Sequence, residues 1–191
     1  KGKRKSKGKK NTIDVSIVTP TYNRRTFIPY IRKMILEQTY PISKIEWIIY
    51  DDGTEPIKDL VEDLPFVRYF KSEKKVILGA KRNFLNEKAK GKYIVCMDDD
   101  DYYPPERVEY AVNALKRSQC MLAGTSKLHI YYIDKNIMNI SGPFNPYHAC
   151  NGSLAFKKEY TLHHKYIDTK ERGEEPGFLN NFSEPLIQLN S

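Results

Sequence analysis

The chain has 191 residues, of which 40% are hydrophobic and 29% are charged. This length and composition suit one globular domain with a sizeable core, and they exclude a disordered or membrane-embedded polypeptide. No apolar run approaches the roughly 20 residues that a membrane-spanning helix needs. The three cysteines (Cys96, Cys120 and Cys150) cannot all pair within the chain, so we expect a reducing compartment and a cytoplasmic location.

The formal net charge of +8 is concentrated at one end of the chain. Residues 1–10 contain seven Lys or Arg and no acidic residue, which leaves a net charge of +1 for residues 11–191. We expect a disordered basic tail, because like charges repel one another and cannot form a core. Three interpretations of the tail stay open: it is a solvated extension, it is a linker cut from a longer protein, or it makes a weak contact with an anionic surface. The nearly neutral remainder carries no RNA- or DNA-binding motif, which disfavours a nucleic-acid partner.

After the basic tail, strand patterns alternate with helix patterns. Residues 13–19 predict a buried strand, and residues 26–38 predict a helix whose apolar side chains recur at helical spacing. Residues 45–50 are rich in branched and aromatic side chains and predict a second strand. Residues 54–64 predict a short helix with Thr54 as its cap.

The alternation then continues along the chain. It predicts a third strand over residues 66–70, a helix over 81–90, a fourth strand over 93–97 and another helix that starts at Pro105. This order is typical of an α/β fold with a mostly parallel central sheet and helices on both faces. In such sheets, ligands bind beyond the carboxyl ends of the strands.

The pattern becomes irregular after residue 118. Residues 121–133, 137–140 and 150–156 predict further strands, while residues 161–191 show weak periodicity. Within this last stretch, His163 and His164 are expected to end a helix. We therefore expect one domain over residues 11–191, with a regular half over 11–118 and an irregular half over 119–191.

Polar clusters follow three of the predicted strands: residues 20–24, Asp51 with Asp52, and the four aspartates of residues 98–101. The carboxyl ends of parallel strands share one edge, so these clusters are expected to meet. Four adjacent carboxylates favour a divalent cation, which takes one or two of them together with phosphate oxygens. The simpler alternative is a solvated acidic turn before Pro105. No G-x-G-x-x-G follows the first strand, which disfavours a dinucleotide site.

Three segments in this order carry a family resemblance: VSIVTPTYNR over residues 15–24, IIYDDGT over 48–54, and LGAKRNFLNEKAKGKYIVCMDDDD over 78–101. They resemble the nucleotide-binding half of family 2 glycosyltransferases of GT-A fold. The resemblance implies a metal-dependent, inverting transfer of sugar from a nucleotide sugar, with a UDP-sugar as the expected donor. It makes residues 11–118 the nucleotide-binding half and residues 119–191 the acceptor-side half.

The resemblance also assigns roles to individual residues. Tyr22 is expected near the uracil, Asp52 at the uracil N3–H, Asp98 at the ribose, and Asp100 together with Asp98 at Mn²⁺ or Mg²⁺. The run of four aspartates leaves the register open by one, so Asp99 and Asp101 are alternatives. The expected nucleotide-binding residues are Pro20, Thr21, Tyr22, Arg24, Asp52, Lys81, Arg82, Asp98 and Asp99.

A transferase of this kind also needs a base for the acceptor hydroxyl. The segment GEEPGFL resembles the acidic pair of the family, which makes Glu175 the expected base and Glu174 the second choice. Here Glu replaces the usual Asp, and Pro176 follows directly. The segment over residues 145–156 resembles the acceptor side, with His148, Asn151 and Gly152 near the sugar; His148 is also a candidate metal ligand.

Two other functions stay open at this point. A nucleotidyltransferase also uses aspartates and a divalent metal on an α/β sheet. A non-catalytic binding module could be targeted to surfaces by its basic tail. The expected partners are a nucleotide-sugar donor and a glycan, glycoprotein or other hydroxyl acceptor. We also expect that the chain is a fragment of a larger multidomain protein.

Overall fold

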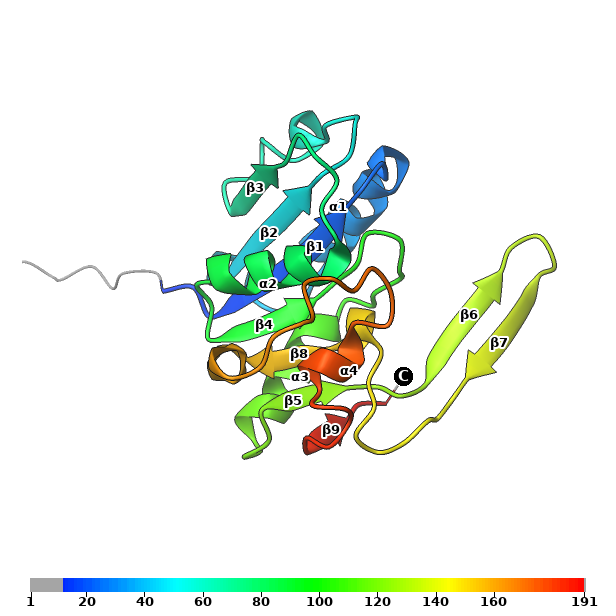
Figure 1. Ribbon diagram of the computed structural model, residues 1–191. Coiled ribbons are helices and arrows are strands. Elements are labelled where there is room, and N and C mark those ends of the chain that lie inside the picture. The colour runs from blue at the N-terminus through cyan, green and yellow to red at the C-terminus, as the bar shows by residue number, and fades with distance from the viewer. Residues whose placement is uncertain (1–11, 191) are drawn as a thin grey trace, which may run out of the picture.

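A seven-stranded sheet with the strand order β3-β2-β1-β4-β8-β5-β9 forms the centre of the computed structural model, which describes residues 12–190 (Figure 1). The basic tail expected over residues 1–10 lies outside the described residues. The sheet strands are β1 (Val15–Thr21), β2 (Ile45–Asp51), β3 (Val67–Lys71), β4 (Tyr93–Cys96), β5 (Leu122–Gly124), β8 (Ala155–Lys157) and β9 (Leu186–Gln188). The α-helices are α1 (Ile28–Leu36), α2 (Leu78–Lys88), α3 (Arg107–Lys116) and α4 (Glu175–Phe178).

The pairing of the strands confirms the predicted α/β fold. β1 pairs in parallel with β2 and β4, and β2 pairs in parallel with β3. β8 is the exception, because it pairs antiparallel with both β4 and β5. The sheet is therefore mostly parallel, and strands from the irregular half extend it beyond β4.

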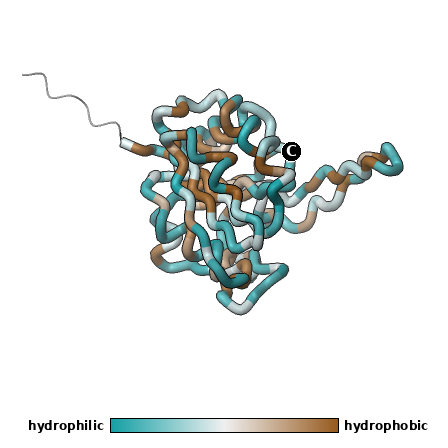
Figure 2. Tube along the Cα trace, turned by 90° about the horizontal axis from the view of Figure 1, so that it is seen from above, coloured by the Kyte–Doolittle hydropathy of each residue, from teal (hydrophilic) through white to brown (hydrophobic). Residues whose placement is uncertain are grey.

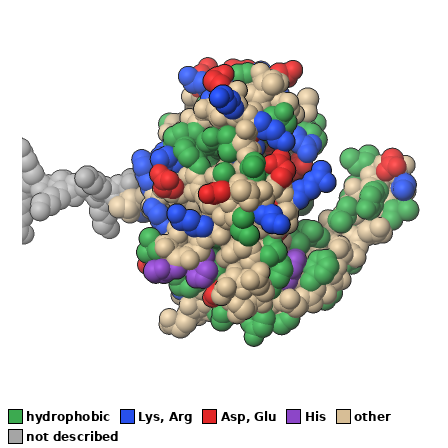
Figure 3. Space-filling view, in the orientation of Figure 1, with side chains coloured by type: hydrophobic (Ala, Val, Ile, Leu, Met, Phe, Trp, Pro, Cys, Tyr) green, Lys and Arg blue, Asp and Glu red, His purple; other side chains and the backbone are tan. Residues whose placement is uncertain are grey.

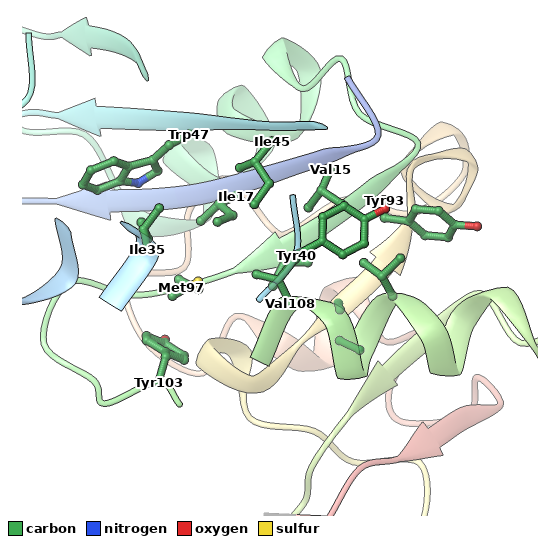
Figure 4. Packing of buried hydrophobic residues seen from close by; sticks show 14 of the residues in the cluster. Val15, Ile17, Ile35, Tyr40, Ile45, Trp47, Tyr93, Met97, Tyr103 and Val108 are labelled. Carbon is green, nitrogen blue, oxygen red and sulfur yellow. The ribbon is translucent and has the colours of Figure 1, made fainter. Parts of the chain in front are cut away.

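Helices cover both faces of this sheet, as the alternating pattern predicts (Figure 1). On one face, Ile35 of α1 and Val108 of α3 belong to the same apolar cluster as Ile17 and Trp47 (Figure 4). On the other face, α2 and α4 pack against a second apolar cluster. None of the helices in the described part of the chain has both the length and the apolar character needed to cross a membrane.

The segment predicted as a helix over residues 54–64 is mostly turns, with one short 3₁₀-helix, η3 (Lys58–Leu60). Local hydrogen bonds explain why no α-helix forms here, because the Asp51 carboxylate accepts from the backbone N–H groups of Gly53 and Ile57 at 2.8 and 3.3 Å. These bonds fold the chain back on itself before a helix can start. Ile57 and Val61 are nevertheless buried.

The strand predicted over residues 121–133 is two strands in different sheets, β5 and β6 (Leu128–Tyr132). Between them the Thr125 hydroxyl accepts from the backbone N–H of Lys127 at 3.1 Å, a side-chain turn that ends β5. β6 pairs only with β7 (Ile137–Ser141), and this hairpin projects from the body (Figure 1). Figure 2 shows hydrophobic residues along this hairpin as well as in the body.

Two further differences concern the last third of the chain. Part of the strand predicted over residues 150–156 is a 3₁₀-helix, η4 (Asn151–Ser153), and β8 starts after it. The short edge strand β9 lies in the stretch of weak periodicity, where no strand is expected from the sequence. Three residues give too little alternation to be recognised as a strand.

Candidate functional site

The polar clusters that follow β1, β2 and β4 lie at one edge of the sheet. The strand register places Thr21 opposite Asp51, and Val18 opposite Cys96. Backbone hydrogen bonds continue this alignment beyond the strands, because Met97 N–H donates to the Val18 carbonyl at 3.2 Å. The segments that carry the expected nucleotide and metal residues therefore meet, although up to 80 positions separate them in the sequence.

A pocket of about 270 Å³ opens at this edge. It contains all of the expected nucleotide-binding residues except Asp52, and it also contains Asp100. Three lining residues are not among those expected from the sequence: Lys75 before α2, Leu78 at the start of α2, and Glu171 from a distant loop. Beyond the right-hand end of α2, which is its N-terminal end, Figure 3 shows acidic and basic side chains side by side. The pocket is lined by Pro20, Thr21, Tyr22, Arg24, Lys75, Leu78, Lys81, Arg82, Asp98, Asp99, Asp100 and Glu171.

Tyr22 presents an aromatic ring to this pocket, with 38% of the residue exposed. The ammonium groups of Lys75 and Lys81 lie 5.1 and 5.7 Å from its ring centre. Lys75 is also paired with Glu171 at 2.9 Å, and this hydrogen bond raises the pKa of the lysine. The pocket therefore combines the partly exposed ring of Tyr22 with two ammonium groups.

Asp52 lies behind the pocket wall. Its Oδ1 is 2.5 Å from Lys81 Nζ, and its Oδ2 accepts from the backbone N–H of Val76 at 2.6 Å. Both side chains are buried, so Asp52 neutralises Lys81 and fixes its position in the first turn of α2. The structure thus brings Asp52 next to the pocket, with both carboxylate oxygens already bonded.

The aspartates of residues 98–101 have different surroundings. Asp98 accepts from the Arg82 guanidinium through both oxygens, at 2.9 and 3.0 Å. Asp99 is buried, and its Oδ2 has no hydrogen-bond partner among the described residues. Burial, followed by the like charges of Asp100 and Asp98, raises the pKa of Asp99 to about 6. Asp100 is more exposed and lies 3.1 Å from Arg24.

These surroundings fit a divalent cation that also binds phosphate. In the described residues, no group of three or more His, Cys, Asp or Glu side chains is arranged to hold a metal ion by itself. Mg²⁺ and Mn²⁺ need only one or two carboxylates when phosphate oxygens complete the coordination. In the described part of the chain, Asp99 has an oxygen without a partner and Asp100 has only a weak, exposed ion pair, so both can offer oxygens to a cation in the pocket. Asp98 has no oxygen that is not already bonded to Arg82.

The two acids of the expected base segment, Glu174 and Glu175, also differ in burial and in hydrogen-bond partners. Glu174 is buried and accepts from Arg82 Nε at 2.8 Å. Glu175 is half-buried and accepts from the backbone N–H of Asn151 at 3.2 Å. Pro176 lies in the first turn of α4, where a proline is well tolerated because that turn needs no donor. Of the two, Glu175 has the carboxylate without a cationic partner among the described residues.

Asn151 and Gly152 belong to η4, which lies against the aspartate loop. A Cβ atom on Gly152 would come within 2.4 Å of Asp101 Oδ2 and 3.1 Å of the Tyr103 hydroxyl, so a larger residue here would displace the Asp101 side chain. Burial and then the charges of Glu175 and Asp101 raise the pKa of Cys150 to about 11. The candidate base and the aspartate loop therefore both lie next to η4.

His148 lies farther along the acceptor side, between the rings of Phe144 and Phe182 at 4.7 and 4.8 Å. Burial lowers its pKa, against the opposing effect of Glu175. Its Nδ1 is buried without a partner among the described residues, and no aspartate of residues 98–101 contacts it in hydrogen-bond range. The structure therefore places His148 near the candidate base and not at the aspartates.

A larger cavity of about 600 Å³ lies at the base of the β6–β7 hairpin. Among the described residues, its lining includes Lys127, Phe144 and Gln188 but no Asp or Glu. The Gln188 amide is already bonded to backbone groups of Ser126, Pro146 and His148. The smaller pocket is the better candidate site, because it gathers the charged and aromatic groups.

Comparison with known proteins identifies the family of this chain. The family model described as "Glycosyl transferase family 2" matches residues 16–171. A putative teichuronic acid biosynthesis glycosyltransferase, TuaG of Bacillus subtilis, is 26% identical over 58% of this chain and 45% of its own length. The Escherichia coli protein WfaP, a UDP-Glc:alpha-D-GlcNAc-diphosphoundecaprenol beta-1,3-glucosyltransferase, is 29% identical over 69% of this chain and 51% of its own.

Solved structures share the fold. The crystal structure of S. aureus TarS 1-349 in complex with UDP-GlcNAc has a TM-score of 0.76 at 14% identity, covering 94% of this chain and 57% of that one. The mannosyltransferase PcManGT from Pyrobaculum calidifontis, in complex with GDP-Man and Mn²⁺, has a TM-score of 0.73 at 17% identity, covering 94% and 55%. The chain spans about half, or less, of the curated relatives described above. With a family model that covers most of its length and a GT-A fold, this chain belongs to glycosyl transferase family 2.

Proposed function

We propose that this domain transfers a sugar, with inversion, from a UDP-sugar to a hydroxyl group and that it requires Mn²⁺ or Mg²⁺. The observation that carries the proposal is the pocket at the carboxyl ends of β1 and β4. It joins the Tyr22 ring, the basic groups and the aspartates, and Glu175 lies beyond η4. The names of the relatives agree with a nucleotide-sugar donor, since UDP-GlcNAc, UDP-Glc and GDP-Man all occur in them.

The donor would occupy the 270 Å³ pocket. Stacking of a base on an aromatic ring such as Tyr22 contributes about 1–3 kcal/mol. Lys81, Lys75 and Arg24 supply positive charge for a diphosphate beside this ring. Asp52 holds Lys81 in place through a buried ion pair, so we assign Asp52 to the nucleotide side of the site.

Asp99 and Asp100 would hold the divalent cation, since they have the oxygens that fit it. When bound, such a cation supplies positive charge that stabilises a departing diphosphate. Arg24 is paired with Asp100 in this structure at 3.1 Å and so lies where it can contact the same phosphate groups.

Glu175 would act as the base on the acceptor side. The acceptor oxygen attacks the anomeric carbon, the bond from that carbon to the diphosphate oxygen breaks, and the hydroxyl proton passes to Glu175. The nucleoside diphosphate leaves with the electron pair of the broken bond. A single displacement inverts the anomeric configuration, and a positioned base contributes roughly 10²–10⁴-fold to the rate. Gly152 and Asn151 lie beside Glu175, where a glycan, a glycoprotein or another hydroxyl acceptor would bind.

A donor panel tests the proposal. The chain is incubated with UDP- and GDP-sugars in the presence of Mn²⁺, Mg²⁺ or EDTA, and the released nucleoside diphosphate is measured. We expect release from at least one UDP-sugar with metal, and loss of release in EDTA and in Asp100→Ala. Deletion of residues 1–10 should leave release unchanged.

Three results would contradict the proposal. If the chain neither cleaves nor binds any donor under any metal condition, it is not a nucleotide-sugar-dependent enzyme. Release of pyrophosphate with transfer of a nucleotidyl group would indicate a nucleotidyltransferase. A function that survives Asp100→Ala but is lost on deletion of residues 1–10 would indicate a binding module.

A further inference from the structure

Arg82 lies at the centre of the site, but its donors point into the protein. Only 6% of its side chain is exposed. Nη1 and Nη2 donate to the two oxygens of Asp98 at 2.9 and 3.0 Å, and Nε donates to Glu174 Oε1 at 2.8 Å. These bonds connect α2 with the aspartate loop and with the residue that precedes Glu175.

Asn151 provides a second connection to the candidate base. When its amide nitrogen donates to the Tyr166 hydroxyl at 2.5 Å, its Oδ1 lies 2.6 Å from Arg82 Nη1 and 3.1 Å from Nη2 and accepts from both. The backbone N–H of Asn151 in turn donates to Glu175 Oε1 at 3.2 Å. Arg82 therefore reaches Glu175 by two routes: through Asn151, and through Glu174, its neighbour in the chain.

We infer that Arg82 is a positioning residue that fixes the base Glu175 relative to the aspartate loop and does not bind the nucleotide. The role assigned to Glu175 rests on the proposed function. Asp98 belongs to the same unit, because both of its oxygens are bonded to Arg82. Arg82 lines the pocket, yet the partners described above use its Nε and both terminal nitrogens.

Arginine suits this role better than lysine. A planar guanidinium donates in several fixed directions, whereas the single ammonium of lysine cannot reach three acceptors held on three segments. The cluster also places two carboxylates, Asp98 and Glu174, on one buried cation. Removing that cation would leave both acids close together without compensation, and the segments that carry them would separate.

The test compares Arg82→Lys with Arg32→Lys, a matched control in an exposed ion pair with Asp63. UDP binding is measured by calorimetry with Mn²⁺, and nucleoside diphosphate release from the best UDP-sugar gives kcat and KM. In Arg82→Lys we expect unchanged UDP affinity and a fall in kcat of about 100-fold, the size that small misplacements of a catalytic group can cause. A loss of UDP affinity of about tenfold or more, the effect expected when a charged hydrogen bond to a ligand is removed, would overturn the inference.

Amide hydrogen exchange provides a readout that does not depend on activity. Exchange over residues 150–153 and 174–179 should accelerate in Arg82→Lys and stay unchanged in Arg32→Lys. Unchanged exchange in Arg82→Lys would overturn the inference even if the enzyme turns over a sugar donor. Conversely, accelerated exchange in a chain that cleaves no donor would contradict the proposed function and leave the positioning of this segment established.

If Arg82→Lys does not fold, Glu174→Gln serves instead, because it keeps the size of the side chain but removes the charge that pairs with Arg82 Nε. We expect UDP affinity to be retained, kcat to fall and exchange over residues 174–179 to accelerate, each in the same direction as in Arg82→Lys. No change in either kcat or exchange would overturn the inference.

Discussion

Residues 13–118 and residues 119–190 contribute to the same site in different ways. In the first half, every residue of β1 and β4 is buried, and the carboxyl ends of these strands lie at the pocket. In the second half, β6 and β7 are exposed, and the candidate base lies on a short helix beside a 3₁₀-helix. The sheet therefore positions most of the pocket residues, while local contacts such as the hydrogen bond from Asn151 position Glu175.

The largest expected effect concerns the acceptor side. Glu175→Gln removes the carboxylate that would accept the proton, so sugar transfer should fall by about 10²–10⁴-fold while UDP affinity is retained. Transfer is measured with the donor found in the panel, and Glu159→Gln on the exposed surface is the control. If the variant transfers sugar at a rate within a few-fold of the parent, Glu175 is not the base.

The next largest effect concerns the stability of the sheet that carries the pocket. Trp47 in β2 is fully buried and donates to Thr19 Oγ1 at 2.9 Å. Trp47→Ala should lower the free energy of unfolding by about 3–5 kcal/mol, measured by urea denaturation. Trp47→Phe keeps most of the apolar volume and should cost less. Equal losses in the two variants would show that packing around this strand contributes little.

A smaller effect depends on pH. Burial raises the pKa of Glu46, but hydrogen bonds from Ser16, Arg68 and the backbone of Lys90 outweigh burial and hold it below 4.5. The folded state therefore gains stability from ionised Glu46 above about pH 4.5, and this gain is lost as the pH falls through the lowered pKa. Glu46→Gln should cost about 1–3 kcal/mol near pH 7.

Urea denaturation of Glu46→Gln and of the parent between pH 7 and pH 3 measures this effect. The difference in free energy of unfolding should stay constant near neutral pH and shrink below pH 4.5, where the parent loses its advantage. A difference that grows on acidification would mean that the pKa of Glu46 is raised in the folded protein.

The smallest effect is expected in the projecting hairpin. Tyr131 lies opposite Met138, and both side chains are exposed. Tyr131→Ala should change the free energy of unfolding by no more than about 0.5 kcal/mol, because no core contact is lost. A loss comparable to that of Trp47→Ala would show that the hairpin is packed in solution, and the contrast between the two halves would then disappear.

The accuracy of the sequence predictions depends on the length and regularity of each element. Continuous apolar strands and helical spacing predict β1 to β4 and α1 to α3, because each element has enough residues to show its period. The predictions are wrong over residues 54–64 and 121–133, where the side chains of Asp51 and Thr125 bond to nearby backbone groups and form turns. Such local competition depends on geometry that periodicity does not contain.

The sequence by itself determined the α/β fold and the convergence of acidic segments, because strand order and the parallel sheet place those segments at one edge. The tertiary structure alone decided which carboxylates are free. Arg82 binds Asp98 and Glu174, Lys81 binds Asp52, and Asp99 keeps an oxygen without a partner within residues 12–190. Neighbouring acids look alike in a sequence, but their ion pairs and burial depend on contacts between segments that are distant along the chain.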